Sequence, residues 1–444
     1  MTPFPGGLMV IAAAPRLSTP APAVSAPTGH RDTGIDVVRA LCVLGVVLLH
    51  AVMVGVTVSE SGPVFENASD GTGWIAPLSW LLQVMPLFFV IGGFSGLLAY
   101  RRLRDRGGSA TAFVAGRVHR LLRPALFTIA AVGIALAVLT VVGVSPDLIA
   151  VAGFRYGQPL WFLGVFLLCQ ALLPAFVALH DRAPLRTIGL LAAAAVAVDV
   201  LRATTGNDAL GFLNLAFVWL TMQQLGFFLA DGRVDALRPG VRVAIGTGSL
   251  GLLVALFLGG VYSPDLIANI NPPTAALLLV GLIHTTLFSL YRDRIGRFSR
   301  HTPVAAFTAF VTRRTMTIYL WHMPVLLVMA GATALAAIVG GLSLPALDSV
   351  EWWAARPLWL VTALVLTALV AVGVDRFENH PSPKATDSRR RLVLGTAVGL
   401  TGVVLLLVLG TTVSTAALAV LLLVAALRLA GRSGSAVPAP AVVA

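Results

Sequence analysis

The chain has 444 residues, of which 57% are hydrophobic and only 11% are charged. A soluble protein of this length could not remove that much apolar surface from water, so the composition excludes a soluble globular protein and predicts a polytopic membrane protein. The net charge of +12 could suggest nucleic acid as a partner. The arginines, however, lie in short stretches between apolar runs, which argues against nucleic-acid binding and is typical of loops between membrane spans.

The two ends of the chain differ from the rest. Residues 1–30 are rich in Pro, Ala, Ser and Thr, and residues 431–444 have a similar composition. We expect disordered tails at both ends. The apolar patch LMVIAAA near the start is short and has no basic leader, so a cleaved signal peptide is not expected.

Between the tails, apolar runs recur that are long enough to cross about 30 Å of hydrocarbon as a helix. Their lengths are helical, without the short alternating strands of a barrel, and this predicts an all-α polytopic transmembrane helical bundle. The predicted spans are twelve, near 35–58, 75–99, 121–144, 158–180, 186–201, 209–230, 241–260, 272–290, 315–340, 357–374, 392–409 and 412–428.

Positive charge predicts how the bundle is oriented. If the N-terminus is cytoplasmic, all of the 31 lysines and arginines lie on the cytoplasmic side except Arg155, Arg202 and Arg356. Such asymmetry is what positive-inside insertion produces. We therefore expect a multi-pass protein of the inner (plasma) membrane with both termini in the cytoplasm. The abundance of Ala, Gly, Val and Arg suggests a bacterial source with a GC-rich genome.

The first span carries an arginine and a histidine in RALCVLGVVLLH, at Arg39 and His50. Eleven residues at 100° each place both on one helix face, about 16 Å apart along the axis. Asp36, one turn earlier, can pair with Arg39. An arginine at a helix end often only reaches the interface, and a lone histidine often only packs in the bundle. Together they suit a ligand that lies along the helix with an anionic head at Arg39, and a neutral His50 could take up a proton.

Other intramembrane polar residues give weaker signals. Cys42 and Cys169 fall inside predicted helices and are interpreted as small core residues, not as a disulfide or metal pair. Asp199 and His284 could line a cavity, because charge facing lipid is disfavoured. Asn271, followed by two prolines, is expected to cap the span that starts near 272.

Four stretches occur together in an order and spacing known from one family. They are RALCVLGVVLLH with its Arg-x10-His pattern, PLFFVIGGFSG (86–96), GRVHRLLRPAL (116–126) with Arg120 and Arg123 as Arg-x-x-Arg, and TIYLWHMPV (317–325). In these the chain resembles the acyltransferase 3 family of integral-membrane proteins, which move acyl groups, usually acetyl, onto hydroxyls of glycans and other molecules. One departure is Gly92-Gly93-Phe94, where the family has Ser-Gly-Phe.

The resemblance covers about residues 31–376 and implies a ten-helix acyltransferase 3-like domain there. Residues 377–430 would then add a basic loop and two extra transmembrane helices, for which the sequence offers no function. The fourth span, QPLWFLGVFLL, is similar to family members with Leu-Trp-Phe-Leu but lacks the Glu pair of other branches.

The resemblance also implies the chemistry. The acyl donor would be acyl-CoA, normally acetyl-CoA, as a co-substrate, with no permanently bound cofactor and no metal. Arg39, Arg120 and Arg123 would contact its phosphates, which guanidinium groups bind bidentately, although basic residues there can also serve topology alone. His322 and Trp161 would either line the donor slot or pack in the bundle.

His50 is the expected catalytic residue, as a general base or as a nucleophile that forms an acyl-histidine, and the sequence does not separate the two routes. The expected function is thus O-acyl transfer to a hydroxyl of a glycan, lipid-linked sugar or metabolite. The alternative is a twelve-span secondary transporter or exporter, because RRLRDRGG (101–108) loosely resembles a basic transporter loop. Against it, the halves show no internal repeat and no long central loop.

Overall fold

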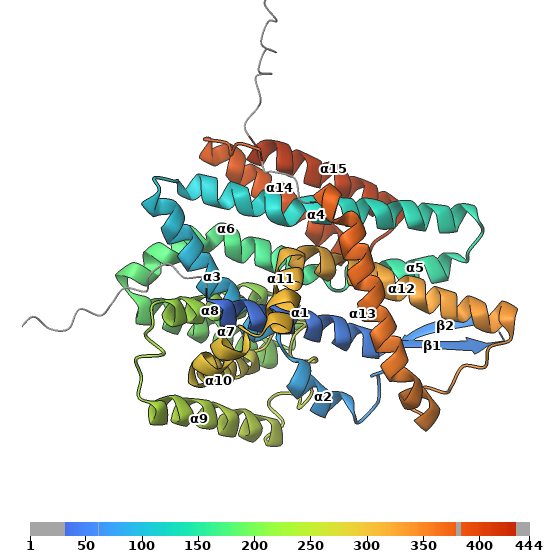
Figure 1. The fold of residues 1–444 in the computed structure, drawn as a ribbon, viewed down its shortest axis with the longest axis horizontal. Coiled ribbons are helices and arrows are strands. Elements are labelled where there is room, and N and C mark those ends of the chain that lie inside the picture. Colours follow the sequence, from blue (N-terminus) through green and yellow to red (C-terminus); the bar gives the residue numbers. More distant parts are fainter. Residues whose placement is uncertain (1–31, 61, 379–382, 432–444) are drawn as a thin grey trace, which may run out of the picture. The chain divides into compact units, whose positions relative to one another are not determined.

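The computed structural model describes residues 32–60, 62–378 and 383–431 and is helical apart from one β-hairpin (Figure 1). The predicted N-terminal tail, and all of the C-terminal tail except Gly431, lie outside the described residues. The elements are α1 (Thr33–Met53), β1 (Val54–Ser59), β2 (Gly62–Asn67), α2 (Ile75–Leu82), α3 (Met85–Asp105), α4 (Ala110–Val141), α5 (Pro146–Gly157), α6 (Leu160–Arg182), α7 (Pro184–Thr205), η1 (Asp208–Leu213), α8 (Asn214–Ala230), α9 (Pro239–Leu258), α10 (Ala276–Phe298), α11 (Thr302–Arg313), α12 (Thr315–Gly340), α13 (Val350–Glu378), α14 (Arg389–Val408) and α15 (Val413–Ala430).

The prediction of a polytopic helical bundle is confirmed. Within the described residues, 11 helical segments are long and apolar enough to cross a membrane. That is one fewer than the sequence predicted, because α10 does not qualify. Its 23 residues would suffice in length, but His284 and the charged end from Arg292 onward interrupt the apolar run.

The first predicted span, 35–58, ends early. The helix stops at Met53, and VGVTVS continues as β1, which pairs antiparallel with β2. Valine and threonine are β-branched and Gly55 is a poor helix former, so this stretch favours a strand once it leaves the bundle. His50 consequently lies in the last turn of α1 and not deep within a longer helix.

Helix α1 contacts many of the other elements, as Figure 1 shows for the dark blue helix among α3, α10, α11, α12 and α13. Helix α3 crosses α8 at very short range. A Cβ at Gly93 would lie 2.2 Å from the Gln223 carbonyl oxygen, and one at Gly226 only 2.0 Å from that of Val90. These glycines therefore fix the position of α3, which forms one wall of the site described below.

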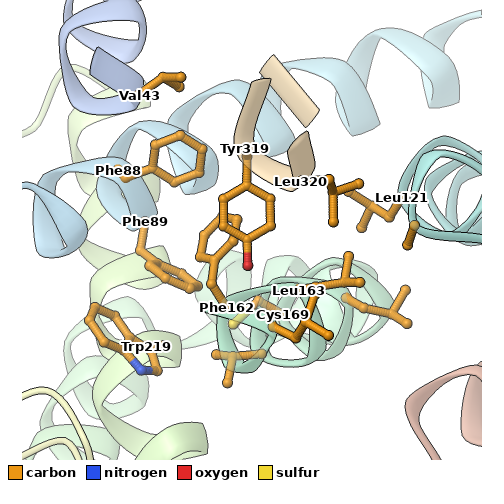
Figure 2. Packing of buried hydrophobic residues seen from close by; sticks show 14 of the residues in the cluster. Val43, Phe88, Phe89, Leu121, Phe162, Leu163, Cys169, Trp219, Tyr319 and Leu320 are labelled. Atoms are coloured by element: carbon orange, nitrogen blue, oxygen red, sulfur yellow. The ribbon is translucent and has the colours of Figure 1, made fainter. Parts of the chain in front are cut away.

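Aromatic side chains fill the core beside α1. Phe89 stacks on Trp219 with ring centroids 4.4 Å apart, and Phe162 meets Tyr319 edge-on at 4.7 Å. Figure 2 shows these rings with Val43 and Phe88 at their α1 side. Because rigid rings pack with defined geometry, this cluster holds α3, α6, α8 and α12 in register with one another.

The last two helices form a hairpin that packs against α4 and α6 (Figure 1). Glycines and alanines line the contact between α14 and α15, and Gly399 also faces Leu122 of α4. Small residues let membrane helices approach closely. The hairpin thus covers α4.

Candidate active site

Arg39 is anchored on one wall of the bundle. Its guanidinium forms an ion pair with Asp36 at 2.9 Å and donates to the Ser95 hydroxyl of α3 at 2.5 Å. Asp36 is buried, and the Arg39 side chain keeps 20% of its exposure. The predicted pairing of Asp36 with Arg39 is present. Ser95 was not predicted, yet it supplies a hydroxyl only three residues from Gly92, where the family motif has serine.

His50 lies at the opposite end of the same helix face and meets a second histidine. His322 Nε2 lies 3.2 Å from His50 Nδ1, and the two ring centroids are 5.0 Å apart. His322, the eighth residue of α12, is fully buried. The structure therefore brings together two predicted site residues that are 272 positions apart.

The backbone carbonyls around this pair define where the protons lie. His322 Nδ1 is 2.5 Å from the Tyr319 carbonyl oxygen and His50 Nδ1 is 3.0 Å from that of Val46. A carbonyl can only accept, so both Nδ1 atoms carry hydrogen when the rings are neutral. His322 Nε2 then holds a lone pair that accepts from His50 Nδ1. His50 Nε2 is left as an unprotonated nitrogen without a partner among the described residues.

An apolar cavity runs beside α1 between the positions of Arg39 and His50. Its lining comes from four helices, and its volume is about 20 Å³, room for about one water molecule. The lining residues are Val43, Val46, Val47, Met85, Phe88, Phe162, Thr315, Met316 and Tyr319. The three valines share the Arg39–His50 face of α1, because successive positions recur every 3.6 residues.

The predicted arginine pair on α4 is placed differently from Arg39. Arg120 is exposed and Arg123 is half-buried. Arg117, one turn earlier, is half-buried, and its charge interacts with those of both Arg39 and Arg120. It stacks over Phe113 at 4.8 Å and has no acidic partner within the described residues. GRVHRLLR holds two overlapping Arg-x-x-Arg pairs, and spacing alone could not select 117/120 over 120/123.

Trp161 lies in the aromatic core. It stacks on Trp219 with centroids 5.5 Å apart and does not line the cavity, although the next residue, Phe162, does. This placement favours the packing alternative that the sequence left open. A ligand contact by Trp161 stays a prediction.

Two other polar residues lie away from the α1 cavity. Asp199 accepts hydrogen bonds from Asn214 at 2.8 Å, from Tyr262 at 2.7 Å and from the Ala275 backbone at 2.7 Å. Burial and the bond to Asp199 raise the pKa of Tyr262, so its hydroxyl remains a donor. Helix α10 begins at Ala276, and Asp199 satisfies its N-terminus. The expectation that Asn271 caps this helix is therefore wrong. His284 Nδ1 is buried and has no partner within the described part of the chain.

Cys42 and Cys169 are both free and buried, as predicted. Among residues 32–60, 62–378 and 383–431, no group of three or more His, Cys, Asp or Glu side chains is placed to hold a metal ion. The polar groups at the two ends of this face of α1 are an imidazole pair at His50 and, around Arg39, guanidinium groups and the Ser95 hydroxyl. These groups suit proton transfer beside a bound anion.

The model of the acyltransferase 3 family, described as an acyltransferase domain, matches residues 32–376. The chain belongs to the acyltransferase 3 family. Comparisons with curated proteins and with solved structures gave no match. The matched range contains α1 to α13 and hence Arg39, His50 and His322, whereas α14 and α15 follow it. The chain is therefore a multi-pass membrane acyltransferase by family.

Proposed function

We propose that the protein transfers an acyl group, in the usual case acetyl, from acyl-CoA to a hydroxyl of a glycan, lipid-linked sugar or metabolite. Family membership supports acyl transfer. The distribution of arginines supports an inner-membrane protein with both termini in the cytoplasm, which requires α10 to cross the membrane as a twelfth span. The abundance of Ala, Gly, Val and Arg supports a bacterial source. The donor would then enter from the Arg39 end of α1.

The proposed donor path follows the charges and then the cavity. The phosphates of coenzyme A would meet Arg39 and Arg117, with Arg120 and Arg123 at the rim. Guanidinium groups bind phosphate through paired hydrogen bonds, and Arg117 has no acidic partner to displace among the described residues. The apolar lining beside Val43, Val46 and Val47 suits the uncharged arm that carries the thioester, and the small cavity there would widen as the arm enters. His322 would not touch the donor itself and would act on it by orienting His50.

The chemistry would occur at His50 Nε2. This nitrogen takes the proton of the acceptor hydroxyl while the hydroxyl oxygen attacks the thioester carbonyl carbon. The tetrahedral intermediate then collapses: the carbon–sulfur bond breaks, the ester remains on the acceptor, and the coenzyme A thiolate takes the proton from the His50 imidazolium. No other reactant is needed.

His322 would orient the base. Its Nε2 lone pair accepts from His50 Nδ1 at 3.2 Å, which keeps the His50 ring in one orientation and stabilises the charge that forms on it. This is the role of the third member of a catalytic triad, filled here by an imidazole. The contact between the two histidines is the single observation that carries the proposed mechanism.

Radiolabelled acetyl-CoA supplied to the purified full-length protein tests the proposal. We expect label on an added hydroxyl acceptor in the wild type and at least a hundredfold less with His50→Ala, since general-base catalysis contributes about 10²–10⁴-fold. Binding of coenzyme A by the variant should persist. Unaltered turnover in His50→Ala would reject the role of His50. Stoichiometric transport of label without ester formation would instead favour the transporter alternative.

The two catalytic routes are separable in the same preparation. With acetyl-CoA alone, general-base catalysis leaves the protein unlabelled after rapid gel filtration at neutral pH, where acid cannot hydrolyse an acyl-imidazole. A covalent route deposits label on His50. We expect no acyl-histidine, because the His50 Nδ1–His322 contact suits proton uptake at Nε2.

A further inference from the structure

A second guanidinium lies buried near the His50 end of α1. Arg356 of α13 is only 8% exposed, and its guanidinium carbon lies 3.6 Å from the ring centre of Trp352 and 5.5 Å from that of Trp359. Within the described residues it has neither an ion-pair nor a hydrogen-bond partner. Stacking on the indole rings stabilises the Arg356 cation. It uses none of the five N–H donors, which lie in the plane of the guanidinium group.

The neighbouring indoles add further unused donors. The Nε1 atoms of Trp74 and Trp352 are buried and have no hydrogen-bond partner. The two rings are adjacent, with centroids 6.3 Å apart. A buried donor without an acceptor is unfavourable, so two of them beside an unpaired guanidinium point to an acceptor that binds there. Arg356, Trp352 and Trp74 together form what we call the α13 donor cluster.

The donor cluster is connected to the proposed base. Trp359, one turn after Arg356, donates through Nε1 to the Ala51 carbonyl oxygen at 2.9 Å. Ala51 directly follows His50 in the last turn of α1. The cluster therefore lies at the end of α1 opposite Arg39. One guanidinium group is thus found near each end of this helix, Arg39 near its start and Arg356 near His50.

We propose that the α13 donor cluster binds an oxyanion, a carboxylate or a phosphate, carried by the acceptor of the acyl group. This assignment rests on the proposed function for its reaction but not for its binding. A planar guanidinium pairs bidentately with such a group, and the N–H donors of the two adjacent indoles would add to its coordination. Indole faces also give flat apolar surfaces against which a sugar ring can lie. The acceptor would thus be an acidic sugar or a phosphorylated molecule, not a neutral glycan.

Binding tests the cluster without any turnover. The full-length protein, in a detergent free of phosphate and sugar, would be titrated calorimetrically with glucuronic acid, glucose 6-phosphate, glucose and a short-chain phosphatidylglycerol. We expect glucuronic acid or glucose 6-phosphate to bind and glucose to bind at least tenfold more weakly. Arg356→Gln should weaken binding of the anionic sugar at least tenfold. Arg202→Gln removes another arginine from the predicted outer side, one paired with Asp208, and should leave binding unchanged.

A second variant keeps the test decisive if Arg356→Gln does not fold. Trp352→Phe retains a ring under the guanidinium but loses the N–H donor, and we expect several-fold weaker binding of the anionic sugar. Equal binding of glucose and glucuronic acid, or unchanged affinity in both variants, would overturn the proposal. The proposal would also be overturned if phosphatidylglycerol were the one ligand tested whose binding depends on Arg356, because the cluster would then hold a lipid headgroup.

Turnover then separates this inference from the proposed function. Loss of transfer in His50→Ala with intact anion binding supports both. Wild-type protein that binds the anionic sugar but never transfers label contradicts the proposed reaction and leaves the binding site standing. In an active enzyme, Arg356→Gln should raise the KM for glucuronic acid relative to that for glucose by at least tenfold.

Discussion

Two imidazoles 3.2 Å apart make a chemically asymmetric pair, because the carbonyls of Val46 and Tyr319 fix both Nδ1 protons. Only one of the two rings has a nitrogen left for a substrate. In the proposed mechanism His50 is therefore the residue that reacts, and His322 the one that positions it.

Replacing His322 tests the positioning role. His322→Ala should lower kcat about a hundredfold, as loss of an orienting partner lowers general-base catalysis, while the KM for acyl-CoA changes little. His322→Gln can still accept through its side-chain oxygen and should recover part of kcat. Steady-state kinetics over both substrates give the readout. A rise in KM for acyl-CoA at constant kcat would place His322 in donor binding instead.

Replacing Arg117 tests the proposed donor head. Arg117→Gln should raise the KM for acyl-CoA about tenfold, because a charge-assisted contact to phosphate is worth about 1.5–3 kcal/mol. Arg102→Gln is the matched control, since Arg102 is exposed in the preceding basic stretch. Equal effects of both variants would mean that the basic stretch acts only through its overall charge.

The sequence could name His50 and His322 as candidates but could not predict the contact between them. Helical periodicity placed Arg39 and His50 on one face, and the structure agrees. Periodicity could not pair His50 with His322, because a contact between helices distant in the sequence leaves no local pattern. The sequence also could not decide which of the two overlapping arginine pairs on α4, 117/120 or 120/123, faces the donor. Ser95 escaped notice because it lies outside the position that the family motif marks.

At the level of elements, the α3–α8 crossing holds one wall of the cavity. Gly93→Ala places a methyl group 2.2 Å from the Gln223 carbonyl oxygen, which α3 can relieve only by moving. Overpacking of this kind typically costs about 1–3 kcal/mol, so we expect a clear drop in melting temperature together with reduced activity. Gly189→Ala, on α7, meets no atom within 4 Å and should melt like the wild type or slightly higher.

Asp231 links the ends of α3, α6 and α8 through charge. It accepts from Arg101 at 2.5 Å and from His180 at 3.2 Å. Burial alone would raise the pKa of Asp231, but the hydrogen bonds from His180 and Arg101 outweigh it and lower that pKa to about 2.

The pH dependence of stability follows from this shift. Because the pKa of Asp231 is lower in the folded than in the unfolded protein, its ionised carboxylate stabilises the fold. This stabilisation is fully present above the usual pKa of 3.8 and is lost as the pH falls toward about 2. The melting-temperature difference between wild type and Asp231→Asn should therefore be constant from pH 7 to pH 5 and shrink below pH 4. A difference that grows on acidification would contradict this sign.

Element boundaries were predictable where apolar runs stand alone. The span expected at 315–340 is α12 (Thr315–Gly340). The sequence did not predict the β-hairpin after α1, because VGVTVS is apolar enough to be taken as a continuation of the membrane helix. The break between α2 and α3 was missed too. There Gln83 turns its side chain to the Leu266 carbonyl oxygen at 2.7 Å, a tertiary contact that composition does not reveal.

For the whole molecule, orientation decides which end of α1 meets the donor. In a background with Cys42 and Cys169 replaced by alanine, Asp105→Cys should react with a membrane-impermeant maleimide only after cells are opened. Gly73→Cys should react in intact cells. Both positions are exposed, so accessibility reports on the side of the membrane. The reverse pattern would place the predicted donor entrance outside the cell.

The α14–α15 hairpin lies outside the family match and packs on α4, away from the α1 cavity. Since α4 carries Arg117, Arg120 and Arg123, the hairpin holds the helix that presents the proposed donor contacts. This arrangement gives the two extra spans a structural role in the whole molecule.

The most direct measurement is an experimental structure of the full-length protein with a non-hydrolysable thioether analogue of acetyl-CoA. We predict phosphates within hydrogen-bond distance of Arg39 and Arg117, the arm in the cavity beside Val43 and Val46, and the acyl carbonyl carbon about 3–3.5 Å from the site where a hydroxyl held by His50 Nε2 would attack. An analogue bound elsewhere, or one whose acyl group lies away from the two histidines, would contradict the proposed mechanism.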